Sequence, residues 1–451
     1  MSTPFRYARA NKGSRRVFSR TAIGAVLAGI VLTCTLGGCS NAKATSSTGG
    51  NSNGVTSSQI LVGALNSQSG PLPADFAPII YGVKAYFNMV NAHGGVNGRK
   101  IVLPGNLNLD DASSPSQDVD QARALVDQYH VFAVVGVATP SFSGASYLAQ
   151  HDIPTFGYPI ETQWTDGPSL FGTTGSYVDF ASPQPEAAFL ASQVHAKNVA
   201  VLAYNINQSS QACQGIVSSI KQFGFNVAYE DLSIPAPAGD LSSDITHIRD
   251  SGATFVASCM DIDGNIRLAQ QLQQAGLTGI TQYWLDGYDQ SYLKSYSSLM
   301  QGVYFLIGHV PFEAVSAYPG KYPGMATYLA EMNKFYPKYA YSEVALNGWI
   351  AADQFVTGLR SIGRDVTRTR LVGAINKETN FTAQGIIPAV NWVSGGHNAT
   401  QGPLCDAFVQ VQGDRFVPVF GTDGTAFTCF NYPYPNVTTP TTIPLQPGII
   451  G

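Results

Sequence analysis

The chain has 451 residues, of which 44% are hydrophobic and 12% are charged, enough apolar sequence for two domains with separate cores. Its first 38 residues contain six basic and no acidic side chains, and the remainder has 19 basic and 29 acidic residues, a net charge of −10. This acidic balance argues against a nucleic-acid-binding surface.

The N-terminal segment has the features of a bacterial export signal. Its basic residues precede an apolar run at 22–36, which is too short to predict a membrane span. Residues 36–39 (LGGC) are similar to a lipobox, in which the cysteine becomes the lipidated first residue of the mature protein. An ordinary cleavage site with an incidental cysteine is the alternative. Residues 14–20 (SRRVFSR) also resemble a twin-arginine export signal, although a plain basic head fits equally well.

These features predict three N-terminal parts. We expect a signal peptide at 1–38 and lipidation of Cys39, which would anchor the protein to the outer side of the cell membrane. Residues 40–58 are small, polar and without periodicity, so 39–58 should form the anchor and a flexible tether.

The following sequence alternates between strand and helix patterns. The first predicted elements are a strand at 60–65, a helix from Pro78, a strand at 100–103, a helix at 116–129 and a strand at 131–135 that ends at Gly136. The pattern restarts near residue 179, with strands at 199–204, 225–230, 254–258, 281–285 and 302–307 between helices at 209–223, 241–250 and 265–275. This alternation predicts parallel sheets flanked by helices.

The C-terminal third departs from that alternation. We expect helices at 324–335, 342–362 and 366–377, followed by antiparallel strands between Cys405 and Cys429. The tail at 433–451 is rich in Pro and Thr and should be loosely ordered.

The stretch 131–143 (VFAVVGVATPSFS) has the pattern of a buried strand that leads into a helix N-terminus. Backbone N–H groups at such a helix start point into a crevice and suit a carboxylate or another acceptor-rich ligand. An ordinary strand-to-helix loop is the alternative.

The cysteine pattern predicts two disulfides. Outside the export segment the chain keeps Cys213, Cys259, Cys405 and Cys429, an even number in a protein expected to be exported. Their spacings do not fit a zinc site. Cys213 should lie on a helix beside the strand that ends at Cys259, and the other two flank a predicted hairpin, so we expect the pairs 213–259 and 405–429.

No catalytic motif is present in the sequence. The seven histidines are scattered, and neither a G-x-S-x-G elbow nor a G-x-x-x-x-G-K-[ST] loop occurs. Loop carboxylates at 110–111, Asp261, Asp263 and Asp286 are more typical of solvated or capping residues than of acid–base or metal groups. We therefore expect a protein that is not an enzyme, with no catalytic residues, no metal site and no cofactor.

Three segments carry a resemblance to a known family. ILVGALNSQSGPL (60–72), NAHGGVNGRKI (91–101) and VFAVVG (131–136) resemble the branched-chain amino acid-binding (Leu/Ile/Val-binding) type I periplasmic binding proteins, which are substrate-binding lipoproteins of ABC transporters. The resemblance implies two Rossmann-like α/β lobes with parallel sheets flanked by helices, joined by a three-strand hinge. It places lobe 1 at 59–178 and 310–380, and lobe 2 at 179–309 and 381–432.

The resemblance also implies a ligand site between the lobes, with the loop at 67–76 closing the cleft. The implied ligand-binding residues are Gln68, Thr139, Ser141, Phe142, Tyr158, Glu161, Tyr204, Gln208, Asp261, Asp286 and Tyr288. Ser141 would hold a ligand carboxylate and Asp286 a ligand ammonium, while Tyr204 and Tyr288 could equally be core residues. The bulky Phe142 and the sequence at 158–161 depart from the family pattern, so aromatic acids, amides and other small carboxylates remain open besides branched-chain amino acids.

The implied function is that of an extracytoplasmic solute-binding protein of an ABC importer. It would capture a small amino-acid-like, carboxylate or amide ligand and dock on the ABC permease subunits, held at the membrane by its lipid. A ligand sensor that signals to a partner without transport is the alternative, and a surface hydrolase with an unrecognised site is a third.

Overall fold

A computed structural model describes residues 52–181, 185–394, 396–397, 399–400, 405–421 and 424–430, all of which belong to the compact unit Gly49–Gly451. The predicted signal peptide, Cys39 and the tail at 433–451 lie outside the described residues. Residues 52–58, which we expected in the tether, bond to the domain instead: Leu61 N donates to Gly54 O at 2.8 Å and Arg99 Nε donates to Thr56 O at 2.8 Å.

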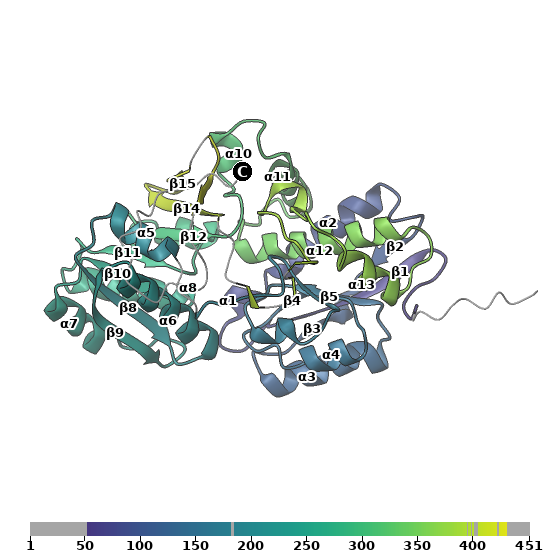
Figure 1. The fold of residues 1–451 in the computed structure, drawn as a ribbon, viewed down its shortest axis with the longest axis horizontal. Helices are drawn as coiled ribbons and strands as arrows, with labels where there is room; N and C mark the ends of the chain where they lie inside the picture. The colour runs from purple at the N-terminus through teal and green to yellow at the C-terminus, as the bar shows by residue number, and fades with distance from the viewer. Residues whose placement is uncertain are drawn as a thin grey trace, which may run out of the picture. The chain divides into compact units, whose positions relative to one another are not determined.

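The first sheet is entirely parallel (Figure 1). Its strands are, in spatial order, β2 (Lys100–Val102), β1 (Gln59–Asn66), β4 (Ala133–Ala138), β5 (Thr155–Gly157) and β6 (Leu170–Gly172), with β3 (Asn108–Asp110) also paired to β1. Every residue of β4 is buried, as its apolar run predicted. The prediction that Gly136 ends this strand is wrong. Gly136 has φ +101°, a conformation open to glycine, and the strand continues beyond it through a register shift.

Helices from both ends of the chain cover this sheet. They are α1 (Pro73–Phe76), α2 (Ile79–Ala92), α3 (Pro115–Arg123) with a π-helical turn at Ala124–Gln128, α4 (Ala145–Gln150), α11 (Pro323–Phe335), α12 (Glu343–Ile362) and α13 (Arg368–Ile375). Helices α2 and α12 pack closely because each has a glycine at the contact. A Cβ on Gly82 would lie 1.7 Å from Ala345 O, and one on Gly348 would lie 1.9 Å from Ile79 O.

The second sheet is mixed. Its order is β15 (Arg415–Val419), β14 (Cys405–Gln412), β12 (Tyr304–Ile307), β11 (Thr281–Trp284), β10 (Phe255–Ser258), β8 (Asn198–Tyr204) and β9 (Asn226–Ile234), with β16 (Phe427–Cys429) paired to β14. Strands β8 to β12 are parallel, and β14 to β16 are antiparallel to their neighbours, as the sequence predicted. Helix α5 (Pro185–Gln193) precedes its first strand in the chain, and the helices that follow its strands are α6 (Asn207–Gln222), α7 (Ser242–Ser251), α8 (Ile262–Gln274) and α9 (Gln290–Tyr296).

The chain passes between the two halves three times. It leaves the first sheet after β6, returns after β12 through α10 (Ala314–Ala317) to α11 and α12, and passes back after α13 to β14. A short parallel pair, β7 (Tyr177–Val178) with β13 (Ala399–Thr400), lies on two of these connections. The fold class predicted from the sequence is confirmed: two α/β units with parallel sheets flanked by helices. Within the described ranges, none of the helices has the length and apolar character needed to cross a membrane.

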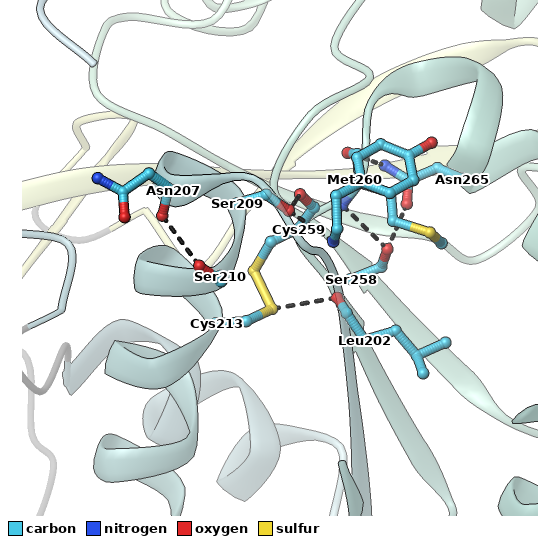
Figure 2. The surroundings of a disulfide bond; sticks show 10 residues. Leu202, Asn207, Ser209, Ser210, Cys213, Ser258, Cys259, Met260 and Asn265 are labelled. Carbon is cyan, nitrogen blue, oxygen red and sulfur yellow. Dashed lines mark hydrogen bonds between the residues drawn. A yellow bond between two sulfur atoms is a disulfide. The ribbon is translucent and has the colours of Figure 1, made fainter. Parts of the chain in front are cut away.

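The predicted disulfide between Cys213 and Cys259 is confirmed (Figure 2). It joins α6 to the residue directly after β10, with the two Cα atoms 5.9 Å apart. Cys405 is also disulfide-bonded, and its Cα lies opposite that of Cys429 in the ladder between β14 and β16. The pairing of Cys405 with Cys429 stays a prediction.

Candidate functional site

A cavity of about 250 Å³ lies where strands of both sheets end. It is lined by α1, by the segments that follow β5, β8, β10, β11 and β12, and by the first turns of α5 and α12. In open parallel sheets, the carboxyl ends of the strands are the edge where ligands bind. The cavity therefore has the position that the fold gives to a ligand site.

Five of the predicted ligand-binding residues line this cavity: Tyr158, Tyr204, Gln208, Asp261 and Asp286. Tyr204 ends β8, and its hydroxyl donates to Asp261 Oδ1 at 2.5 Å and accepts from Ala238 N at 3.1 Å. Asp261 is the N-cap of α8 and accepts from Gly264 N at 2.8 Å. These contacts fix the two side chains at the rim of the second sheet.

The predicted loop after β4 does not line the cavity. Phe142 is fully buried and packs against Trp164, with ring centroids 4.8 Å apart and the rings tilted by 41°. Thr139 is 3% exposed, and Ser141 Oγ lies 3.0 Å from Ser143 Oγ. Gln208, on α6, bridges to this loop, where its Nε2 donates to Pro140 O at 3.1 Å.

Three of the N–H groups that were expected to face a ligand at the start of α4 are bonded within the protein instead. Gly144 is the N-cap, with no capping side chain, and its N–H donates to Asp118 Oδ1 at 2.6 Å. Ser143 N donates to Ser141 O, and Ala145 N donates to Phe142 O. The sequence TPSFS before this helix offers Ser and Thr, but the N-cap is a glycine.

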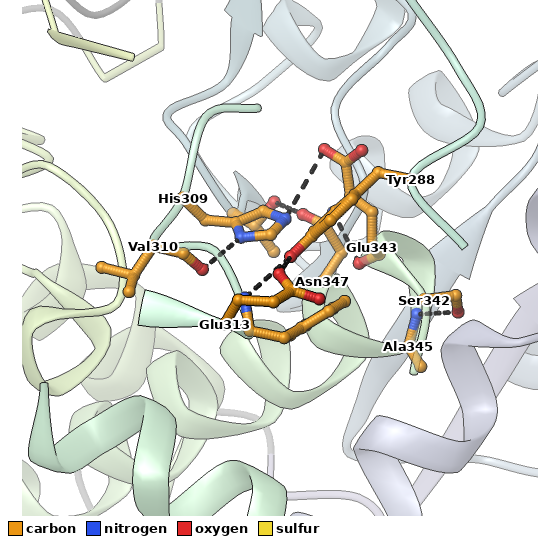
Figure 3. Close-up of polar contacts among 10 residues, drawn as sticks. Tyr288, His309, Val310, Glu313, Ser342, Glu343, Ala345 and Asn347 are labelled. Carbon is orange, nitrogen blue, oxygen red and sulfur yellow. Dashed lines mark hydrogen bonds and ion pairs between the residues drawn. The ribbon is translucent and has the colours of Figure 1, made fainter. Parts of the chain in front are cut away.

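The three remaining predicted residues also lie outside the cavity lining. Gln68 is exposed, and its Nε2 donates to Asn108 O at 3.1 Å. Glu161 is 7% exposed, and burial raises its pKa to about 8. Tyr288 is 2% exposed; its hydroxyl donates to Glu313 Oε2 at 2.5 Å and accepts from Phe312 N, as Figure 3 shows for the side chains of Tyr288 and Glu313.

Sequence reasoning missed four carboxyl groups that line the cavity: Asp75, Glu186, Glu343 and Asp406. Asp75 lies in the loop that was expected to close the cleft, but the other three begin helices or lie on a late strand, far from the strand-end loops of the family pattern. Their signal in the sequence is weak, because acidic residues are common at helix starts. Together with Asp261 and Asp286 they make six carboxyl groups around one cavity.

Asp75 and Asp286 form the first carboxyl pair. Burial raises the pKa of Asp75 well above its ordinary value, and the charge of Asp286 and a hydrogen bond with it add to the shift. Burial likewise raises the pKa of Asp286, to about 6. The two carboxyl groups therefore repel each other when both are charged, and a proton or a cation at this place removes the repulsion.

Glu186 and Asp406 form the second pair. Glu186 lies in the first turn of α5 and Asp406 on β14, and each is 6% exposed. Burial raises the pKa of Glu186 to about 7, and burial together with the charge of Glu186 raises that of Asp406 well above its ordinary value.

Glu343 faces a neutral histidine (Figure 3). Burial lowers the pKa of His309 to about 4, so the ring is neutral at neutral pH, and its Nε2 lies 3.9 Å from Glu343 Oε1. Burial, followed by the charge of Asp286, raises the pKa of Glu343 to about 8.

Most of the remaining lining is apolar. These side chains include Leu72, Phe76, Ile160, Phe180, Ile206, Met260, Leu285, Leu306, Val344, Ile350 and Ile387. The described lining contains no Lys or Arg. In the described ranges, no group of three His, Cys, Asp or Glu residues is arranged to hold a metal ion.

Comparison with known proteins gives the family. The periplasmic binding protein family model matches residues 59–415. A curated relative, Leu/Ile/Val-binding protein homolog 3 from Brucella melitensis, is 25% identical over 246 residues, which are 51% of this chain and 64% of the relative. The chain thus matches less than two thirds of that protein.

Solved structures share the fold. A solute-binding protein of an ABC transporter from R. palustris, in complex with benzoate, has a TM-score of 0.66 at 18% identity, covering 83% of this chain and 98% of that one. A branched-chain amino acid substrate-binding protein from Streptococcus pneumoniae, in complex with isoleucine, has a TM-score of 0.64 at 15% identity, covering 80% and 99%. The family match covers most of the chain, and the observed fold agrees with it. The chain therefore belongs to the periplasmic binding protein family.

Proposed function

We propose that this protein is the extracytoplasmic solute-binding protein of an ABC importer, and that its ligand occupies the cavity described above. The observation that supports this most directly is the position of the cavity. It lies at the carboxyl ends of parallel strands of both sheets, in a chain that matches the family over residues 59–415. The proposal contains no catalytic step.

In this proposal the ligand acts as a bridge between the two sheets. Tyr158 follows a strand of the first sheet, and Tyr204, Asp261 and Asp286 follow strands of the second. A ligand that contacts both sets binds the closed arrangement more tightly than an open one and shifts the equilibrium toward closure. The closed form would then dock on the permease.

We also propose that Cys39 carries a lipid that anchors the protein outside the cytoplasm. The sequence LGGC at 36–39, after a basic and apolar leader, supports this. Substituting Cys39→Ala should release the protein from the membrane fraction and abolish incorporation of a labelled fatty acid. An unchanged membrane fraction would contradict the anchor.

The binding function is tested with the purified full chain. Denaturing the protein and analysing the released small molecules by mass spectrometry identifies any ligand that co-purifies. A ligand at about 100 times its Kd should add roughly 2.7 kcal/mol to the free energy of unfolding, seen as a higher Tm. Uptake of that ligand should fall in cells lacking the protein. Binding with unchanged uptake would favour a sensor over a transport protein.

A further inference from the structure

We propose that the cavity takes an amphipathic organic cation: an amine with an apolar body and no carboxylate. The inference rests on the proposed function, because it names the class of ligand for the same cavity. It differs from the amino-acid-like or carboxylate ligand that the family resemblance implies.

The first argument is the charge of the cavity. Six carboxyl groups line it, while none of its described lining residues is Lys or Arg. The parts of the chain after residue 51 that the structure does not describe contain no Lys or Arg in their sequence either. No segment of that region can therefore supply the missing positive charge.

The second argument is an unsatisfied acceptor. Glu186 is 6% exposed, lines the cavity, and its Oε2 has no hydrogen-bond partner among the described residues. A buried carboxylate oxygen without a partner is unfavourable, because it has lost its hydrogen bonds to water. A ligand that donates hydrogen bonds would remove that cost.

The third argument is that Asp75 and Asp286, which lie on segments of different sheets, both line this cavity and affect each other's charge. Two carboxyl groups at one place repel each other when both are charged, so either one of them holds a proton or a cation lies between them. An ammonium group has three donors and no acceptor, so it can bridge both carboxylates with charge-assisted hydrogen bonds.

The apolar lining supplies a place for the body of the ligand. Phe76, Ile160, Leu285 and Val344 are among the residues that line it, and the cavity measures about 250 Å³. A cavity of about 150 Å³ is known to hold benzene, so this one has room for an aromatic or branched hydrocarbon with an added amine.

A ligand carboxylate finds no Lys or Arg in the described lining of the cavity. The N–H groups of Ser143, Gly144 and Ala145 are bonded within the protein, and Gln208 Nε2 donates to Pro140 O. A carboxylate in the cavity would instead face six acidic side chains and would be repelled by each of them that is charged.

The test is a set of matched ligands measured by isothermal titration calorimetry on the purified full chain at neutral pH. Phenethylamine, phenylalanine and hydrocinnamate share one hydrocarbon, and isopentylamine, leucine and isocaproate share another. Within each set the amine should bind at least about tenfold more tightly than the amino acid, and the acid should bind most weakly.

Two substitutions test the named carboxylates. Asp286→Asn and Asp75→Asn should each weaken amine binding by about 10–100-fold, the value of a charge-assisted hydrogen bond. Asp414→Asn, in the exposed turn between β14 and β15, is the matched control and should leave the affinity unchanged. The ligand series needs no substitution, so it decides the inference even if a variant fails to fold.

The possible outcomes separate this inference from the proposed function. If an amino acid or an acid binds more tightly than its matched amine, the inference is overturned and the proposed function stands. If only inorganic cations such as Na⁺ or Ca²⁺ bind, the inference is overturned as well. If no compound of any class binds, both the inference and the proposed binding function fail.

Discussion

Asp75, which precedes α2, is paired with Asp286, which follows β11 of the other sheet. The pair links the two halves of the protein at the cavity through two groups that repel each other when both are charged. Its stability depends on whether a proton or a ligand cation neutralises it, so ligand binding and proton binding should be coupled in this protein.

Amine binding should release protons. Burial raises the pKa of Asp286 to about 6, and a bound ammonium favours the charged carboxylate and lowers that pKa. The affinity for phenethylamine should therefore increase as the pH rises through about 6. The groups that face Asp286 are Asp75 of α1, Asp261 before α8, Asp289 before α9 and Glu343 of α12.

Calorimetry in buffers with different heats of ionisation measures this release directly. Since Asp75, Asp261, Asp289 and Glu343 all have raised pKa values, they change the number of protons released but not the sign. Proton uptake during amine binding would contradict the arrangement. A carboxylate ligand would give uptake, because it favours the protonated side chains.

The ligand-free protein should lose stability between pH 6.5 and about 8. Burial raises the pKa of Glu186 to about 7 and those of Glu161 and Glu343 to about 8, from an ordinary value of 4.5. The folded state therefore holds protons that the unfolded state has released, and this stabilisation is lost as the pH rises through 7 to 8. Each group contributes at most about 1.4 kcal/mol per pH unit. The Tm should fall over this range and level off above it.

The range begins at pH 6.5 because two buried histidines change stability in the opposite direction below that pH. Burial lowers the pKa values of His309 and His397 to about 4 from 6.5, so they destabilise the fold only as the pH falls below 6.5. Glu186→Gln should flatten the decrease in Tm above that pH, whereas the exposed control Asp414→Asn should not. A decrease of equal slope in both variants would exclude Glu186 as a source.

Substituting Ser141→Ala distinguishes a ligand whose carboxylate is held by Ser141 from the amine proposed for the cavity. The family resemblance predicts that Ser141 holds a ligand carboxylate, in which case binding of leucine or a similar amino acid should weaken about tenfold or more. The structure places Ser141 Oγ against Ser143 Oγ, outside the cavity lining, so we expect less than about a twofold change in affinity for the amine. Titrating phenethylamine into the Ser141→Ala and Asp286→Asn variants gives the comparison. A larger loss of affinity in Ser141→Ala than in Asp286→Asn would contradict the cation site.

Removing the disulfide between Cys213 and Cys259 should destabilise the second α/β unit. The bond spans 46 residues of sequence, for which the chain-entropy model gives about 4 kcal/mol. Urea unfolding of Cys213→Ala/Cys259→Ala against the unmodified chain measures the difference. Substituting both cysteines leaves Cys405, which is bonded elsewhere, in its oxidised form. An unchanged midpoint of unfolding would show that the bond adds no stability.

The sequence was sufficient for the fold class because it depends on local periodicity. Apolar runs such as β4, and the helix pattern of α12, are visible in the residues themselves, and their alternation permits few architectures. The disulfide between Cys213 and Cys259 was also predictable, because both residues belong to consecutive strand–helix units of one sheet.

The lining of the cavity was predictable only in part. The family resemblance implied Tyr204, Asp261 and Asp286, and each of them lies at or after the end of a parallel strand, at the edge where ligands bind. The loop after β4 was expected to offer free N–H groups, but Asp118, 26 residues earlier in the chain, takes the Gly144 N–H. Competition from a distant side chain cannot be read from the loop itself.

The sequence alone determined the two α/β units, their approximate elements and the edge of the sheets where a ligand would bind, since these follow from local pattern and strand order. Only the tertiary structure decided which charges share the cavity. Asp75, Glu186, Glu343 and Asp406 come from segments with no common motif and meet through packing of distant elements. The pKa of each carboxyl group depends on its burial and on the neighbouring charges, and both are properties of the folded chain.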